Sequence, residues 1–227
     1  MTAFVLVHGG FVDGWYWGET AALLEREGHT VHVADLPSTG PDPSTLGGFA
    51  DDVAEVRGLV AAAGEPVVLV GHSYGGMVIT DAADEPRVAH RVYLAAFWPE
   101  RGQTLMDLAT GPLDWIVRTE DGAAVRVTDD DERAAEVLFA DLDPARRVAM
   151  HGHLMYSAAA ALAIPAAAPD RTHPVSYVVL EEDNAILPER QQAMAARADH
   201  VERMATSHCP QLADPAGLAA ILSRIPA

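Results

Sequence analysis

The segment Gly71-His72-Ser73-Tyr74-Gly75 places a serine between two glycines, directly after an apolar run that ends at Val70. In this Gly-x-Ser-x-Gly pattern, a tight turn between a strand and a helix lifts the serine oxygen clear of the sheet. The flanking glycines are a steric requirement, because the strained turn leaves no room for a Cβ at either position. The pattern therefore predicts that Ser73 is a nucleophile.

A serine hydroxyl is a poor nucleophile, so it needs a neutral imidazole to take its proton and a carboxylate to orient that imidazole. In catalytic triads whose serine lies in such an elbow, the acid comes next along the chain and the histidine comes last. Among the 10 histidines, His208 comes just after the strand expected over 201–205. We predict that His208 is the general base, whereas His200 begins that strand and so lies at the wrong end of the sheet.

The orienting acid is expected at the end of the preceding strand, over 175–180. Three carboxylates follow that strand, from Glu181, Glu182 and Asp183. Each could orient His208, and the alternative is that all three are charges on a surface loop. The residues alone leave this choice open.

Acyl transfer to a serine also needs donors for the negative oxygen of the tetrahedral intermediate. The expected donors are the backbone N–H groups of Tyr74, which follows the nucleophile, and of Gly10, in the loop after the first strand. Gly9 and Gly10 allow a close approach of that loop, although a tight turn alone would also explain both glycines.

These residues must be positioned by strands that end at one edge of a sheet. Short apolar strands alternate with helices along the chain, which is typical of an α/β protein with a parallel sheet covered on both faces. Helices are expected over 17–27, from Phe49 to just before Gly64, and from Pro215 with Asp214 as the N-cap. The expected strands cover residues 4–7, 30–36, 67–70, 91–97, 175–180 and 201–205.

The rhythm breaks between residues 98 and 173, a stretch far longer than one crossover helix needs. It contains an expected hairpin of strands 114–117 and 124–127, with an Asp-Gly turn, and expected helices over 133–139 and 145–162. We predict a core made of residues 1–97 and 174–227, with 98–173 as a cap over the carboxyl ends of the strands, where such sheets bind ligands. The residues expected to line an apolar pocket above the serine are Trp98, Trp115, Phe139, Met155 and Leu187.

Composition limits the partners. The chain has 227 residues, of which 49% are hydrophobic, and a net charge of −18, which argues against nucleic acid or an anionic membrane as a partner. The single cysteine, Cys209, excludes an intrachain disulfide, and the His151-Gly152-His153 pair lacks a third metal ligand. We expect no metal and no cofactor.

The amino terminus shows no signal-peptide layout and no apolar run is long enough to cross a membrane, so a cytoplasmic protein is expected. The oligomeric state stays open, with a homodimer among the alternatives.

The chain resembles the plant methylesterase and hydroxynitrile lyase branch of the α/β-hydrolases, and closely its bacterial esterase-type members. The resemblance is weakest in the cap. It implies a six-stranded, mainly parallel sheet of order 2-1-3-4-5-6, Asp183 as the acid, and His72 pointing away from the site. The segments that carry the resemblance are Phe4–Gly10 with Trp15, Gly71–Gly76, Glu182–Pro188 and Ser207–Leu212.

The leading hypothesis is hydrolysis of a small or medium apolar carboxylic ester through an acyl-enzyme on Ser73. The lyase members carry a threonine where this chain has Gly9 and a lysine where it has Cys209, which argues against cyanohydrin cleavage. A cyclase or dehydratase acting on a natural product is the main alternative, since it could keep the same triad and exclude water. A ligand-binding receptor ranks below these, because receptors often lose a triad member.

Overall fold

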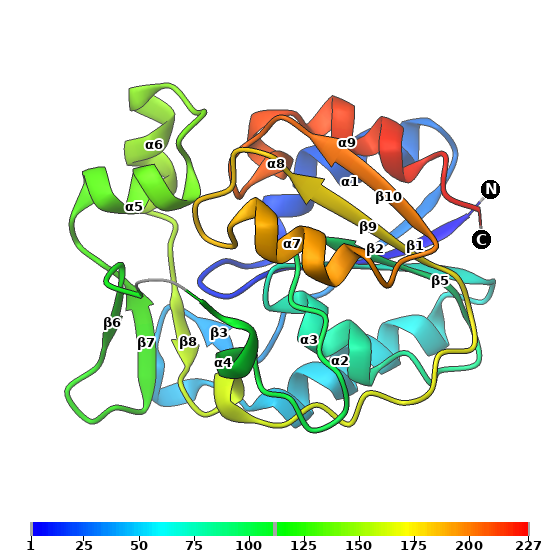
Figure 1. Cartoon of the computed structure of the whole chain (residues 1–227), viewed down its shortest axis with the longest axis horizontal. Coiled ribbons are helices and arrows are strands. Elements are labelled where there is room, and N and C mark those ends of the chain that lie inside the picture. The colour runs from blue at the N-terminus through cyan, green and yellow to red at the C-terminus, as the bar shows by residue number, and fades with distance from the viewer. Residues whose placement is uncertain (1, 111–112, 227) are drawn as a thin grey trace.

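The computed structural model describes residues 2–110 and 113–226, with a six-stranded parallel sheet at its centre (Figure 1). The strands lie in the order β10-β9-β5-β4-β1-β2, and every neighbouring pair is parallel. Counted along the chain within this sheet, that is the predicted order 2-1-3-4-5-6. The strands are β1 (Ala3–Val7), β2 (Thr30–Val33), β4 (Val67–His72), β5 (Val88–Leu94), β9 (Val175–Leu180) and β10 (His200–Met204).

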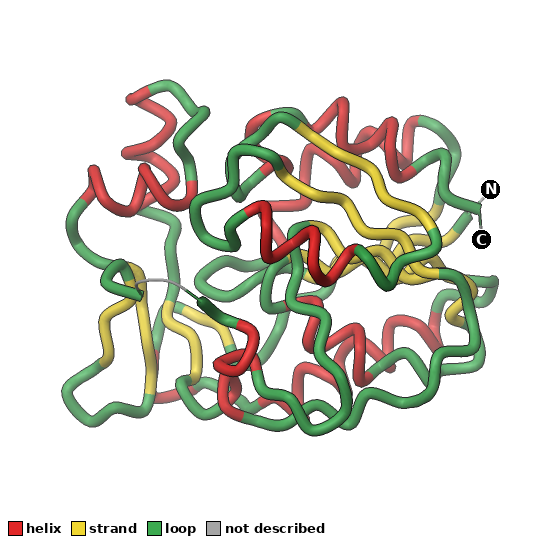
Figure 2. Tube along the Cα trace, in the orientation of Figure 1, coloured by secondary structure: helices red, strands yellow, loops and turns green. Residues whose placement is uncertain are grey.

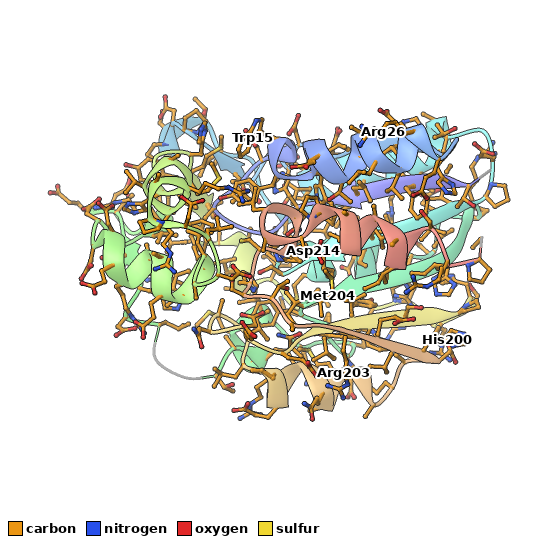
Figure 3. The ribbon with its side chains drawn as sticks, turned by 90° about the horizontal axis from the view of Figure 1, so that it is seen from above. Trp15, Arg26, His200, Arg203, Met204 and Asp214 are labelled. Carbon is orange, nitrogen blue, oxygen red and sulfur yellow. The ribbon has the colours of Figure 1, made fainter. Side chains whose placement is uncertain are left out.

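Alternation along the central strands divides the core between the two faces of the sheet. Phe4 and Leu6 pack with Trp17 on one face, and Val5 and Val7 pack on the other. Helices α1 and α9 lie side by side over the first face (Figure 3). The other face is covered by α2, α3 and α7. The bounds are α1 (Gly18–Arg26), α2 (Phe49–Ala62), α3 (Gly75–Asp81), α7 (Pro188–Ala195) and α9 (Pro215–Leu222), with the short α8 (Pro210–Ala213) before α9.

A second, smaller sheet of order β3-β8-β7-β6 lies beyond the carboxyl ends of the main strands (Figures 1 and 2). Its β6–β7 pair confirms the predicted hairpin. One strand, β3, comes from the segment between β2 and α2, so this sheet is not confined to residues 98–173. The strands of this sheet are β3 (Thr39–Gly40), β6 (Ile116–Arg118), β7 (Ala124–Val127) and β8 (Tyr156–Ala158). The remaining α-helices are α4 (Leu105–Leu108), α5 (Asp131–Leu138) and α6 (Pro144–His151). Short 3-10 helices cover Gly14–Trp17, Pro43–Thr45 and Ala161–Ala163.

Three expected elements were wrong in extent. The strand expected over 30–36 is β2, which ends at Val33. The helix expected over 145–162 ends at His151, and β8 follows it, because pairing with β3 and β7 overrides the helix propensity of the alanine-rich segment. The strand expected over 91–97 is β5, which ends at Leu94. Ala95 has a φ of 40°, which breaks the strand, and the N–H of Phe97 then turns to the carbonyl oxygen of Ser73.

None of the helices in the described part of the chain has the length and apolar character needed to span a bilayer.

A histidine at the amino-terminal edge of the main sheet makes folding sensitive to pH. The pKa of His173 is lowered to about 4, chiefly by burial and then by the charges of Arg91, His90 and Arg171. An unfolded histidine has a pKa near 6.5. The unfolded chain therefore binds a proton between about pH 6.5 and pH 4 that the folded chain does not, so stability falls as the pH drops through this interval.

We expect urea unfolding to give a lower free energy of unfolding at about pH 5 than at about pH 7, with a smaller loss in His173→Gln. Burial also lowers the pKa values of His8 and His72, so the variant keeps part of the dependence. The same loss in both proteins would contradict the role given to His173.

Candidate active site

Ser73 lies in a strained turn between β4 and α3, with a φ of 53°. A Cβ at Gly71 would lie 2.7 Å from the carbonyl oxygen of Gly75, and a Cβ at Gly75 would lie 2.6 Å from that of His8. Only glycine fits these contacts, so the sequence pattern has a direct steric cause. The carbonyl oxygen of Ser73 accepts the N–H of Phe97 at 3.1 Å, which ties the turn to the end of β5.

His208 and Asp183 form a buried pair in the loops that follow β10 and β9. Nδ1 of His208 lies 2.8 Å from Oδ2 of Asp183. The same carboxylate accepts hydrogen bonds from the backbone N–H groups of Ala185 and Ile186 and from Nε2 of Gln191, at 2.7, 3.0 and 2.9 Å. These donors fix its orientation. Since the carboxylate accepts, Nδ1 of His208 carries the proton and Nε2 can accept another.

The structure also separates the three carboxylates that the sequence left as alternatives. Glu181 and Glu182 are exposed, and Glu181 lies 3.6 Å from Arg203 of β10. Only Asp183 among them contacts His208. His200 begins β10, at the end opposite Met204 (Figure 3). The amino-terminal placement of His200 is therefore as predicted.

The prediction that His72 points away from the site was wrong. Its ring centroid lies 4.7 Å from that of His208, and its Nε2 donates to the backbone carbonyl oxygen of His208 at 2.8 Å. Burial, followed by the neighbouring His208, lowers the pKa of His72 well below its ordinary value. A neutral His72 can therefore hold the His208 backbone without adding a charge. The turn packs so closely that a Cβ at Gly9 would lie only 3.3 Å from Nδ1 of His72.

Gly10 and Tyr74, the predicted oxyanion donors, line the same cavity as Ser73. Across residues 2–110 and 113–226, neither backbone N–H has a protein acceptor. His8 orients the peptide that carries the Gly10 N–H, because its Nδ1 donates to the carbonyl oxygen of Gly9 at 2.8 Å. Its Nε2 accepts the N–H of Leu36 at 2.9 Å. Burial lowers the pKa of His8, which favours the neutral ring that this pair of bonds requires.

A cavity that is partly open to solvent contains Ser73 and His208 in its wall. Most of the other lining residues are apolar, and Arg190, which is exposed, contributes a charged side chain. Trp115, Phe139 and Leu187 line it, as the sequence suggested. Further apolar lining residues include Phe11, Phe97, Leu105, Leu138, Leu154 and Ile186.

The other two predicted lining residues lie elsewhere. Trp98 stacks on Tyr93 with ring centroids 4.7 Å apart. The guanidinium carbon of Arg197 lies 4.3 Å from the centroid of the Trp98 ring. Met155 borders a polar groove beside α6. In both cases the preceding residue, Phe97 or Leu154, lines the cavity.

Sequence reasoning missed the residues that support the reacting groups. Gln191 is fully buried and contacts Asp183. Asp52 is fully buried too, where it accepts the Tyr74 hydroxyl at 2.6 Å and the N–H of Ser38 at 2.8 Å. Burial raises the pKa of Asp52. No motif contains these residues, so only the fold brings them to the site.

The His151-Gly152-His153 segment has separate structural contacts. His151 bonds to Asp131, and the His153 ring stacks on Trp15 with centroids 4.8 Å apart. Among the residues that the structure describes, no cluster of three or more His, Cys, Asp or Glu side chains could hold a metal ion. The polar groups at the cavity include those that nucleophilic acyl transfer requires: an elbow serine, an oriented imidazole and two free N–H donors.

The chain shares sequence with one family and with several known proteins. A model of the alpha/beta hydrolase family matches residues 4–221. A carbendazim hydrolyzing esterase from Nocardioides sp. (strain SG-4G) is 42% identical over 114 residues, 48% of this chain and 47% of that protein. Polyneuridine aldehyde esterase from Rauvolfia serpentina is 34% identical over 110 residues, 45% of this chain and 41% of that protein. The match thus spans less than half the length of each relative.

The fold has a close counterpart among solved structures. An extracellular alpha/beta-hydrolase from a Paenibacillus species superposes with a TM-score of 0.85 at 21% sequence identity, over 99% of this chain and 98% of that one. At this identity the likeness concerns the fold. It covers the second sheet and the helices around it as well as the main sheet.

Proposed function

Because the chain belongs to the alpha/beta hydrolase family, we propose that it hydrolyses apolar carboxylic esters through an acyl-enzyme on Ser73. The observation that carries the proposal is the elbow serine in one cavity with His208, whose Nδ1 is held by Asp183. The relatives over the matched segment are named esterases, which supports the same reaction class.

In the proposed first half-reaction, Oγ of Ser73 attacks the ester carbonyl carbon while its proton passes to Nε2 of His208. The carbonyl electron pair moves to oxygen, where the N–H groups of Gly10 and Tyr74 would donate hydrogen bonds to the negative oxygen. Collapse of this intermediate breaks the bond to the alcohol oxygen, which takes the proton from His208. Asp183 keeps the imidazole in the required tautomer and stabilises the imidazolium.

In the second half-reaction, water replaces the alcohol. His208 takes a proton from the water while the water oxygen attacks the acyl carbon. The N–H groups of Gly10 and Tyr74 again donate to the negative oxygen of the intermediate. The carboxylic acid then leaves, and Ser73 recovers its proton from His208. The apolar wall made by Trp115, Phe139 and Leu187 would bind an apolar acyl or alcohol group.

Two features weigh against cyanohydrin cleavage. A Cβ at Gly9 would lie 2.9 Å from Cβ of Ser73, so the close packing here excludes a threonine hydroxyl unless the loop shifts. Cys209 is buried among apolar residues, and burial raises the pKa of its thiol well above the ordinary value. This position therefore offers no cation for a departing cyanide.

The test is the release of p-nitrophenolate from p-nitrophenyl acetate and butyrate by the purified protein, followed by labelling with diethyl p-nitrophenyl phosphate. In the labelling step Oγ of Ser73 should displace p-nitrophenolate from phosphorus, and its proton should pass to His208. We expect one diethylphosphoryl group per chain, on the peptide that contains Ser73, with a matching loss of turnover. Absence of turnover, or a label on another residue, would refute the proposal and favour binding or cyclase chemistry.

A further inference from the structure

The loop that carries Gly10 is held in place from the second sheet. Phe11, the next residue, has a φ of 66°, a left-handed conformation that is unfavourable for a residue with a Cβ. Both of its backbone polar groups are bound by the segment around β8. Its N–H donates to Oγ of Ser157 at 2.9 Å, and its carbonyl oxygen accepts the N–H of Met155 at 2.8 Å.

Ser157 is suited to this contact because it has almost no access to water. It is 3% exposed and lies in β8, where its backbone pairs with Thr39 of β3 and Val125 of β7. Its hydroxyl is also close to Gly10 itself, since a Cβ at Gly10 would lie 3.4 Å from Oγ of Ser157. A buried donor such as the Phe11 N–H that lost this acceptor would remain unpaired, so the loop would be driven to rearrange.

The same strand is connected to the other expected oxyanion donor. The N–H of Ala158 donates to the carbonyl oxygen of Ser38 at 2.8 Å. The N–H of Ser38 donates to Asp52 at 2.8 Å, and Asp52 accepts the hydroxyl of Tyr74 at 2.6 Å. One short strand thus contacts the loop of Gly10 directly and the residue after the nucleophile through two hydrogen-bonded groups.

We propose that Ser157 is a positioning residue for the oxyanion hole. Its Oγ fixes the Gly10–Phe11 peptide and therefore the direction of the adjacent Gly10 N–H, which must lie about 3 Å from the developing oxyanion in the transition state. Ser157 has this role only if Ser73 is the esterase nucleophile proposed above. Ser157 itself does not line the cavity, so loss of its hydroxyl should affect the transition state more than substrate binding.

The test compares Ser157→Ala with Ser176→Ala. Ser176 is also 3% exposed and also forms one buried side-chain hydrogen bond, to Nε2 of His90 at 2.9 Å, but it lies near the amino-terminal end of β9. Ser157→Cys is a second variant, nearly isosteric, whose sulfur is a weak acceptor. With p-nitrophenyl butyrate, we expect kcat to fall roughly 10- to 100-fold in both Ser157 variants with KM within about threefold, and to stay near wild type in Ser176→Ala.

A transition-state analogue separates positioning from a general loss of structure. Oγ of Ser73 adds to the carbonyl carbon of an alkyl trifluoromethyl ketone, its proton passes to His208, and the carbonyl electron pair moves to the oxygen, which becomes negative in the hole. The corresponding alcohol cannot react in this way. Affinity for the ketone should fall in the Ser157 variants by about the same factor as kcat/KM, and affinity for the alcohol should not change. Ser157 variants that match Ser176→Ala in kcat and in ketone affinity would overturn the positioning role alone. Absence of Ser73-dependent turnover in the wild type would overturn both proposals.

Discussion

Replacing Ser73 with alanine is expected to lower kcat for p-nitrophenyl butyrate by roughly 10⁶-fold, to the rate that the remaining groups support without a nucleophile. No neighbouring side chain can replace it. Cys209 is buried, and burial raises the pKa of its thiol well above the ordinary value, so a thiolate is strongly disfavoured there. The backbone φ of 53° strains a residue with a Cβ in both proteins, so stability should stay close to that of the wild type.

Steady-state kinetics and thermal unfolding of Ser73→Ala and Ser207→Ala together check this expectation. Ser207 is the matched control, because its hydroxyl is buried one residue before His208 but bonds to Asp141 instead of facing the cavity. Ser207→Ala should lose far less activity than Ser73→Ala. If Ser73→Ala kept even one hundredth of the wild-type kcat while folded, Ser73 could not be the nucleophile.

The main sheet was predictable because each of its strands carries a local signal. Val67–Val70, for example, is a continuous apolar run bounded by Pro66 and by the glycine of the elbow, and the structure buries it completely. The serine elbow is likewise a local motif. His208 and the loop of Glu181, Glu182 and Asp183 could be placed next to it because parallel strands all end at one edge of the sheet, whatever their distance in the chain. The choice of Asp183 within that loop came from the resemblance to the family.

In the second sheet the β6–β7 hairpin was predictable from its Asp-Gly turn, but β3 and β8 were not. β8 has three residues and β3 has two, so neither has enough length to show a period of alternation. Their pairing joins Thr39 to Ser157, residues far apart in the chain. The alanines after Tyr156 favour a helix, and only contacts made elsewhere in the fold decide against it. Ser157 was missed for this reason, and so was the shift of the cavity wall from Met155 to Leu154.

Asp183→Asn is expected to keep the fold and to lower kcat by about 10⁴-fold. The asparagine amide can still accept the N–H groups of Ala185 and Ile186 through its oxygen, so the loop should stay in place. Its NH₂ group, however, would face Nδ1 of His208, where the carboxylate oxygen now accepts. The imidazole would then bond through an unprotonated Nδ1 and carry its proton on Nε2, where it cannot accept the proton of Ser73.

Glu181→Gln and Glu182→Gln are the matched controls, because each removes one carboxylate from the same loop. Both side chains are exposed and neither contacts His208, so turnover of p-nitrophenyl butyrate should stay within about twofold of wild type. The kinetics should be measured across pH, since the Asp183→Asn tautomer leaves no protonation state of His208 that restores the general base. A large loss in Glu182→Gln with little change in Asp183→Asn would move the orienting acid to Glu182. A large loss in Asp183→Asn alone would mean that the buried carboxylate sets the tautomer on which attack by Ser73 depends.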